Sequence, residues 1–203
     1  MIFIDRLGRK PLLAFGVAGI GLFMMLLAYG FHSATYSLSS ENLNKIEDVA
    51  LKEQLSTLLD TSFDNDVAYK NELKSLLGIE RAKKHESELI AAAIKMNPAM
   101  ILIGIIGFVA CFAVSLGPVM WVLFSELFPL KIRGLAISFV GFANSAVSAG
   151  VQFLFPWELS TIGSAWTFLI YGLFAFIGLI FIIRSIPETK GKSLEEPETL
   201  LVK

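Results

Sequence analysis

Four long stretches without a charged residue constrain this chain more than any other feature of its sequence. Each has at least the roughly 20 residues that an apolar helix needs to cross a bilayer. Because lipid offers no hydrogen-bond partners to the backbone, each is predicted to form a transmembrane helix. A β-barrel would instead show many alternating segments of about ten residues. The stretches are Pro11–Phe31, Pro98–Ser125, Gly134–Trp157 and Leu159–Ile183.

Composition agrees with a membrane protein and argues against several other classes. Hydrophobic residues make up 55 % of the 203 residues, and the mean hydropathy is +0.67, above the range of soluble domains. The net charge of −1 predicts no nucleic-acid partner. No nucleotide-binding, hydrolase or zinc motif is present, since "HESEL" at His85 lacks a second histidine. We therefore expect an all-α membrane protein whose surroundings are the lipid bilayer, with no enzymatic activity, no catalytic residues, no metal and no cofactor.

A charged segment, residues 32–97, separates the first stretch from the second. Leucines at helical spacing, and Gly78 as a C-cap, predict two or three short amphipathic helices within it. One interpretation is a partner-binding or gating surface, and the other is a loop insertion that the fold tolerates. The predicted organisation is an N-terminal loop and first transmembrane helix, a helical extracytoplasmic insertion, three more transmembrane helices and a tail, over 1–31, 32–97, 98–186 and 187–203.

The short connections predict the orientation, because Lys and Arg gather on the cytoplasmic side. "DRLGRK" near the N-terminus is basic, and the turn before Gly134 carries Lys131 and Arg133. The connection between the third and fourth stretches, 157–164, has no Lys or Arg. Both termini are therefore expected in the cytoplasm of a multi-pass protein in the plasma or bacterial inner membrane, with the insertion outside.

The third stretch has a polar face. At spacings of three and four, Asn144, Ser148 and Gln152 fall on one side of a helix, beside Ser145. Such a face is not expected to contact lipid. The pattern leaves open whether it lines a water-filled cavity or packs against another helix.

The second stretch is interrupted by Gly117 and Pro118. Phe112 and Trp121 are nine residues apart, so a straight helix would point them in opposite directions. Proline removes one backbone donor and crowds the carbonyl four residues earlier. We expect a hinge at Gly117 and Pro118, with either a structural kink or a ligand-binding role for the two aromatic rings.

Three motifs in this sequence resemble the sugar porter family of the major facilitator superfamily. "DRLGRK" resembles the family's loop between helices eight and nine, and "GPVMW" followed by "ELFPLKIR" resembles helix ten and its exit. "PETKGKSLEE", residues 187–196, is similar to the C-terminal signature. The resemblance implies helices nine to twelve of a twelve-helix transporter, with an insertion longer than is usual and an N-terminal part as partner.

The same resemblance implies sugar transport by alternating access, incomplete in these four helices alone. Phe112, Trp121 and Asn144 would contact a hexose or pentose, although Ser145 stands where the family often has an aromatic residue. A cytoplasmic gate network would comprise Asp5, Arg9, Glu126 and Arg133. Whether a proton accompanies the sugar, as in a symporter, stays open.

A second hypothesis belongs to a different class of protein. The chain would be a four-helix membrane protein that does not transport, and it would act through its outer insertion as a binding or assembly module. An in-frame continuation of the coding DNA upstream of Met1 that encodes the missing helices would favour the transporter over this second hypothesis.

Overall fold

The computed structural model describes residues 8–44 and 49–186, so Asp5 and the motif at 187–196 lie outside the described residues. The elements in chain order are α2 (Arg9–His32), β1 (Thr35–Ser37), α3 (Ser40–Asn44), α4 (Val49–Leu55), the 3-10 helix η1 (Ser56–Leu58), β2 (Ser62–Phe63), α5 (Asp66–Leu77), α6 (Ile79–Lys84), α7 (Glu86–Ala93), β3 (Ile94–Lys95), α8 (Pro98–Val114), α9 (Leu116–Leu127), α10 (Arg133–Thr161) and α11 (Ser164–Ser185).

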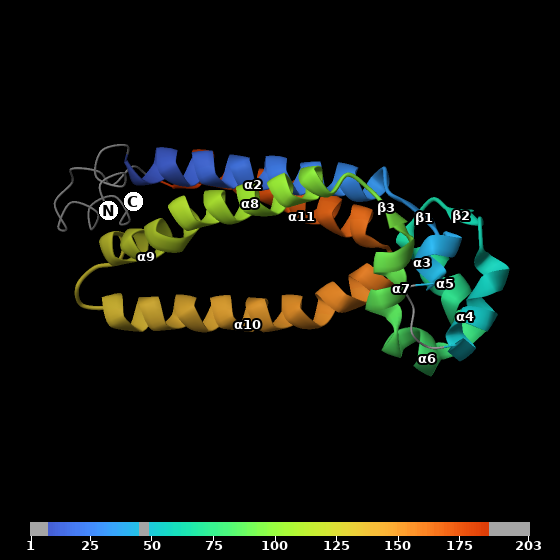
Figure 1. Cartoon of the computed structure of the whole chain (residues 1–203). Helices are drawn as coiled ribbons and strands as arrows, with labels where there is room; N and C mark the ends of the chain where they lie inside the picture. The colour runs from blue at the N-terminus through green and yellow to red at the C-terminus, as the bar shows by residue number, and fades with distance from the viewer. Residues whose placement is uncertain (1–7, 45–48, 187–203) are drawn as a thin grey trace.

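Four segments of the described chain are helical, long and apolar enough to cross a membrane, which confirms the predicted fold class. They are α2, α8 together with α9, α10, and α11. Figure 1 shows them running lengthwise, with the insertion at one end and the α9–α10 turn at the other. We call these the insertion end and the turn end.

Close packing of α2 against α8 and α11 forms the centre of the membrane part. A Cβ atom at Gly16 would overlap the Ser115 side chain, so only glycine allows the two helices this approach. At the turn end, α2, α9 and α11 share a buried apolar cluster, which consists of Leu12, Leu13, Val17, Val119, Leu123 and Ile182.

The insertion has a hydrophobic core of its own, to which Leu55, Tyr69, Leu73 and Leu89 contribute fully buried side chains. Its described residues, 32–44 and 49–97, contain five short α-helices, α3 to α7, where we expected two or three. It also contains an antiparallel sheet in the order β2-β1-β3. Gly78, with a φ of 78°, ends α5 as predicted. An additional boundary lies at His85, where φ is −106° and ψ is 8°, and it separates α6 from α7. Strands of two or three residues are too short to show alternation in the sequence.

Helix α10 differs from the other three because none of its residues is buried in the described structure. Figure 1 shows it set apart from α2, α8 and α11 along most of its length. Pro156 lies inside the helix, where it removes one backbone hydrogen bond. The polar face of α10, with Asn144, Ser148 and Gln152, is therefore exposed.

Candidate functional site

A pocket of about 260 Å³ lies between α9 and α10 and brings Trp121 and Asn144 to the same cavity. Trp121 is 49 % exposed and packs edge-on against Phe124, with 6.2 Å between the ring centroids. The remaining lining is aliphatic apart from Phe124. The seven lining residues are Met120, Trp121, Phe124, Val140, Ala143, Asn144 and Val147.

The chemistry of this pocket is that of a site for a neutral polar molecule. None of its lining side chains is ionisable, so a charged ligand would lose hydration without gaining a partner. The Asn144 amide offers both hydrogen-bond donors and an acceptor, and the Trp121 indole offers an apolar face with one N–H donor. A sugar has hydroxyl groups and apolar C–H faces, and these two side chains complement both.

The break in the second membrane segment lies at Ser115, where φ is −114° and ψ is −88°, and not at Gly117 and Pro118. Those two residues lie within the first turn of α9. Pro118 has no N–H to donate to the carbonyl of Val114, so the helix is interrupted one turn before the proline. The Ser115 hydroxyl also donates to the Cys111 carbonyl at 2.6 Å, a bond that favours bending.

Phe112 lies on the other side of this break, on α8, and is 47 % exposed. It does not line the pocket that holds Trp121 and Asn144. The structure thus brings together two of the three residues expected to contact a sugar. The third is separated from them by the break in the helix.

Two members of the expected gate network form an ion pair at the turn end. Arg9 at the start of α2 donates to Glu126 in α9, with 2.8 Å from Nη2 to Oε1 and 3.2 Å from Nε to the same oxygen. Arg133 instead donates from Nε to the Phe128 carbonyl at 3.1 Å. Its Nη2 is buried without a hydrogen-bond partner within the described structure. Arg9 and Glu126 therefore join α2 to α9, and Arg133 braces the turn before α10.

A contact that the sequence analysis missed joins the insertion to the connection between α10 and α11. Asp66 Oδ2 accepts hydrogen bonds from the Ser164 backbone N at 3.1 Å and from its Oγ at 2.8 Å. Lys70 Nζ lies 3.4 Å from the Leu159 carbonyl and 3.5 Å from Asp66 Oδ2. The carboxylate thus faces the N-terminus of α11 and the ammonium faces the C-terminal end of α10, which suits both helix dipoles.

A signal for this contact is present in the sequence. On α5, Asp66 and Lys70 share a buried face with Tyr69 and Leu73. A charged pair at positions i and i+4 within an apolar stripe indicates a buried contact, because charged side chains are seldom buried without partners. A third charge, Glu86 on α7, lies 3.5 Å from Lys70 Nζ.

Two tyrosines in the core of the insertion have altered acidity. Burial raises the pKa of Tyr36 and of Tyr69 to about 12, from an ordinary value of 10.0. Their rings stack with 5.9 Å between centroids. The Tyr69 hydroxyl donates to the Leu89 carbonyl at 3.2 Å. These contacts hold β1 and α7 against α5, and with them the residues that contact α11.

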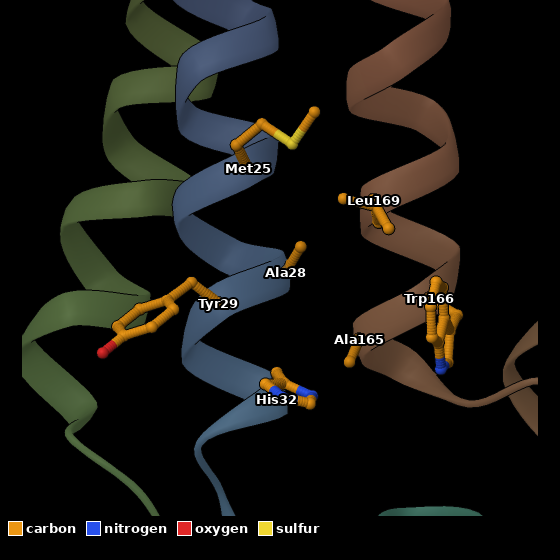
Figure 2. Close-up of a pocket in the computed structure, with 7 residues that line it drawn as sticks. All are labelled: Met25, Ala28, Tyr29, His32, Ala165, Trp166 and Leu169. Atoms are coloured by element: carbon orange, nitrogen blue, oxygen red, sulfur yellow. The ribbon is translucent and has the colours of Figure 1, made fainter.

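A second, more apolar pocket of about 300 Å³ lies between α2 and α11 near the insertion end. Figure 2 shows His32 on α2 and Trp166 on α11 near the end of the two helices, with Met25 and Leu169 further along them. Within residues 8–44 and 49–186, no group of three or more His, Cys, Asp or Glu is placed to hold a metal ion.

Known proteins resemble this chain both in sequence and in fold. The family described as "Sugar (and other) transporter" matches residues 78–201. A mouse (Mus musculus) protein named "Solute carrier family 2, facilitated glucose transporter member 10" is 31 % identical over 217 residues. An Arabidopsis thaliana protein named "D-xylose-proton symporter-like 3, chloroplastic" is 41 % identical over 96 residues, which cover 47 % of this chain and 17 % of that protein.

A solved structure supports the same fold. The proton:xylose symporter XylE bound to 6-bromo-6-deoxy-D-glucose aligns with a TM-score of 0.62 at 25 % identity. The alignment covers 98 % of this chain and 30 % of that one. The alignment with the mouse protein covers 96 % of this chain and 40 % of the mouse protein. This chain therefore spans well under half the length of the relatives that it matches.

Proposed function

Because the chain belongs to the sugar (and other) transporter family, we propose that it supplies four helices of a multi-pass membrane carrier that moves a hexose or pentose by alternating access. The observation that carries the proposal is the pocket between α9 and α10, which Trp121 and Asn144 line together. The names of the relatives support the substrate class, since they describe a glucose transporter and a D-xylose–proton symporter-like protein.

In this proposal, the Trp121 indole covers an apolar face of the sugar and Asn144 hydrogen-bonds its hydroxyl groups. Phe112 forms a more distant wall, because it is half exposed but lies outside the pocket. The break at Ser115 is the hinge across which the angle between α8 and α9 changes. Helix breaks that line a cavity are typical of transporters in which two bodies rock around a central site.

The exposed polar face of α10 supports a site that further helices complete. Asn144, Ser148 and Gln152 are unfavourable in contact with lipid. We propose that helices supplied by a longer chain or by a partner cover this face and form the other wall of the cavity. Since the α9–α10 pocket has no carboxylate in its lining, a residue that couples transport to a proton would lie outside this pocket.

The ion pair between Arg9 and Glu126 is proposed to close the turn end on the cytoplasmic side. Its side chains are only 15 % and 19 % exposed, so water screens the pair less than at an open surface. Opening the carrier inward would separate α2 from α9 and break this pair. Arg133 would hold the neighbouring turn through Phe128.

The test uses a complete carrier in which the additional helices are present, and it measures sugar binding. Trp121→Ala should weaken binding by about 2 to 4 kcal/mol, the scale of a lost aromatic contact plus an unpaired hydroxyl. Trp121→Phe keeps the ring and should lose only about 1 kcal/mol. Trp166→Ala is the matched control, since Trp166 lines the other pocket. Equal affinity in wild type and Trp121→Ala would make Trp121 a packing residue.

A further inference from the structure

A cleft of about 600 Å³ lies between the insertion and the last turns of α10. The wall from the insertion carries Lys74 of α5 and Lys83 of α6, and the wall from α10 carries Trp157. None of these residues belongs to the pocket between α9 and α10. The cleft is therefore a separate feature of the chain, and the proposed transport function does not use it.

The cleft is positively charged. Lys70 forms part of its lining but is held between the carboxylates of Asp66 and Glu86, each 3.5 Å from its Nζ. Lys74 and Lys83 have no ion pair within the described part of the chain. Counting Lys70, Lys74 and Lys83 against Asp66 and Glu86, the net charge here is +1, and the ammonium groups outside the ion pairs are those of Lys74 and Lys83. An anion is the ligand that this arrangement favours.

The cleft also has apolar walls at the depth of a membrane surface. Helix α10 has 29 residues and is therefore about 43 Å long, against about 30 Å for the hydrocarbon core. With α10 centred in the bilayer, about four residues at each end would extend into the headgroup region, which would place Trp157 near its boundary. Trp157 is 59 % exposed and Ile79 69 %, and tryptophan favours this interfacial depth. This depth is the same in either orientation of the chain.

We propose that this cleft binds an anionic phospholipid from the leaflet at the insertion end. The phosphate lies between Lys74 and Lys83, and the upper part of one acyl chain lies along Trp157 and Ile79. Lysine is a suitable point charge for phosphate, and basic pockets beside transmembrane helices bind lipid headgroups. A water-soluble phosphate would leave the apolar walls unused, which is why a lipid is the better occupant.

The experiment measures quenching of Trp157 fluorescence by brominated lipid. The full chain is reconstituted into phosphatidylcholine vesicles that contain a small fraction of phosphatidylglycerol brominated along its acyl chains. Quenching that disappears in Trp157→Phe is assigned to Trp157. We expect brominated phosphatidylglycerol to quench more strongly than brominated phosphatidylcholine at equal fraction. The double variant Lys74→Gln with Lys83→Gln removes both charges. The preference for phosphatidylglycerol over phosphatidylcholine should weaken by about fivefold for each lysine removed.

Three comparisons decide the outcome. Lys84→Gln removes a neighbouring charge of α6 that does not line the cleft, and it should keep the preference. Replacing Lys74 and Lys83 by Arg should also keep it, which separates charge from damage to the fold. Equal quenching by the two brominated lipids in wild type would overturn the proposal, as would an equal loss in Lys84→Gln. Displacement of the lipid by glycerol 3-phosphate would overturn the assignment to a lipid.

Discussion

Replacing Asp66 by Ala should release the insertion from α11. The Asp66 side chain is 8 % exposed and accepts two hydrogen bonds from Ser164, at 2.8 and 3.1 Å. Hydrogen bonds to a charged group contribute about 1.5 to 3 kcal/mol each. Both bonds use the same oxygen, and Lys70 keeps Glu86 and the Leu159 carbonyl as partners. We therefore expect a loss of about 3 kcal/mol in the free energy that holds the insertion against α11.

The assay is amide hydrogen exchange in the first turn of α11, residues 164–167, with the chain in lipid nanodiscs. A loss of about 3 kcal/mol corresponds to roughly 100-fold faster exchange by local opening. Asp66→Asn keeps an oxygen acceptor but loses the charge, so it should lie between wild type and Asp66→Ala. Reading the effect on α11 separates it from any change at the start of α5, where Asp66 also resides.

Asp64→Ala is the matched control, because Asp64 is a nearby carboxylate just before α5 but is exposed. Exchange in α11 should be the same in Asp64→Ala and wild type. If Asp66→Ala exchanged no faster than Asp64→Ala, the contact with Ser164 would contribute nothing in the membrane, and the reasoning from burial and distance would be refuted.

Three further predictions follow from other parts of the chain. Gly16→Ala should lower the free energy of unfolding by about 1 to 3 kcal/mol, because its methyl group would overlap Ser115. Gly178→Ala, whose added methyl group meets nothing within 4 Å, should be neutral in the same melting experiment. Because the pKa of Tyr36 and of Tyr69 is raised, their stabilisation of the insertion is complete below pH 10 and is lost as the pH rises from about 10 to 12. Near-ultraviolet circular dichroism follows this loss, and a signal of the insertion that disappears only above pH 12 would contradict it. A cysteine at Ser62, in a Cys111→Ser background, should react with an impermeant reagent in intact cells, and protection until the cells are permeabilised would reverse the orientation.

The membrane helices could be predicted from the sequence because hydropathy alone requires them, but their ends could not. Glu158 ends an uncharged stretch in the sequence, yet α10 continues through it to Thr161. A single carboxylate near the membrane surface is not a helix breaker. The helix ends near Gly163, whose φ of 88° favours glycine. Hydropathy thus reports where the lipid core ends, and backbone conformation decides where the helix ends.

The candidate site was predictable only in part. The residues of the site are visible in the sequence, but the position of the helix break, and hence which aromatic ring shares a pocket with Asn144, depends on the backbone conformation. Pro118 is visible in the sequence, but the carbonyl that it leaves without a donor belongs to Val114, so the break falls at Ser115. The position of that break then decides that Trp121 shares a pocket with Asn144 and that Phe112 does not. A shift of three residues along a helix is most of one turn.

The contact of Asp66 with Ser164 also bears on the two interpretations of the insertion. A loop that the fold merely tolerates is expected to keep its charged residues in water, since burying a carboxylate or an ammonium group is unfavourable unless each finds partners. Here both groups are buried, and each meets the end of a transmembrane helix. Because the insertion is also covalently continuous with α2 and α8, it links those helices to the α10–α11 connection. Any motion of that connection relative to α2 must therefore either carry the insertion along or break the contact at Asp66, and this favours the gating interpretation.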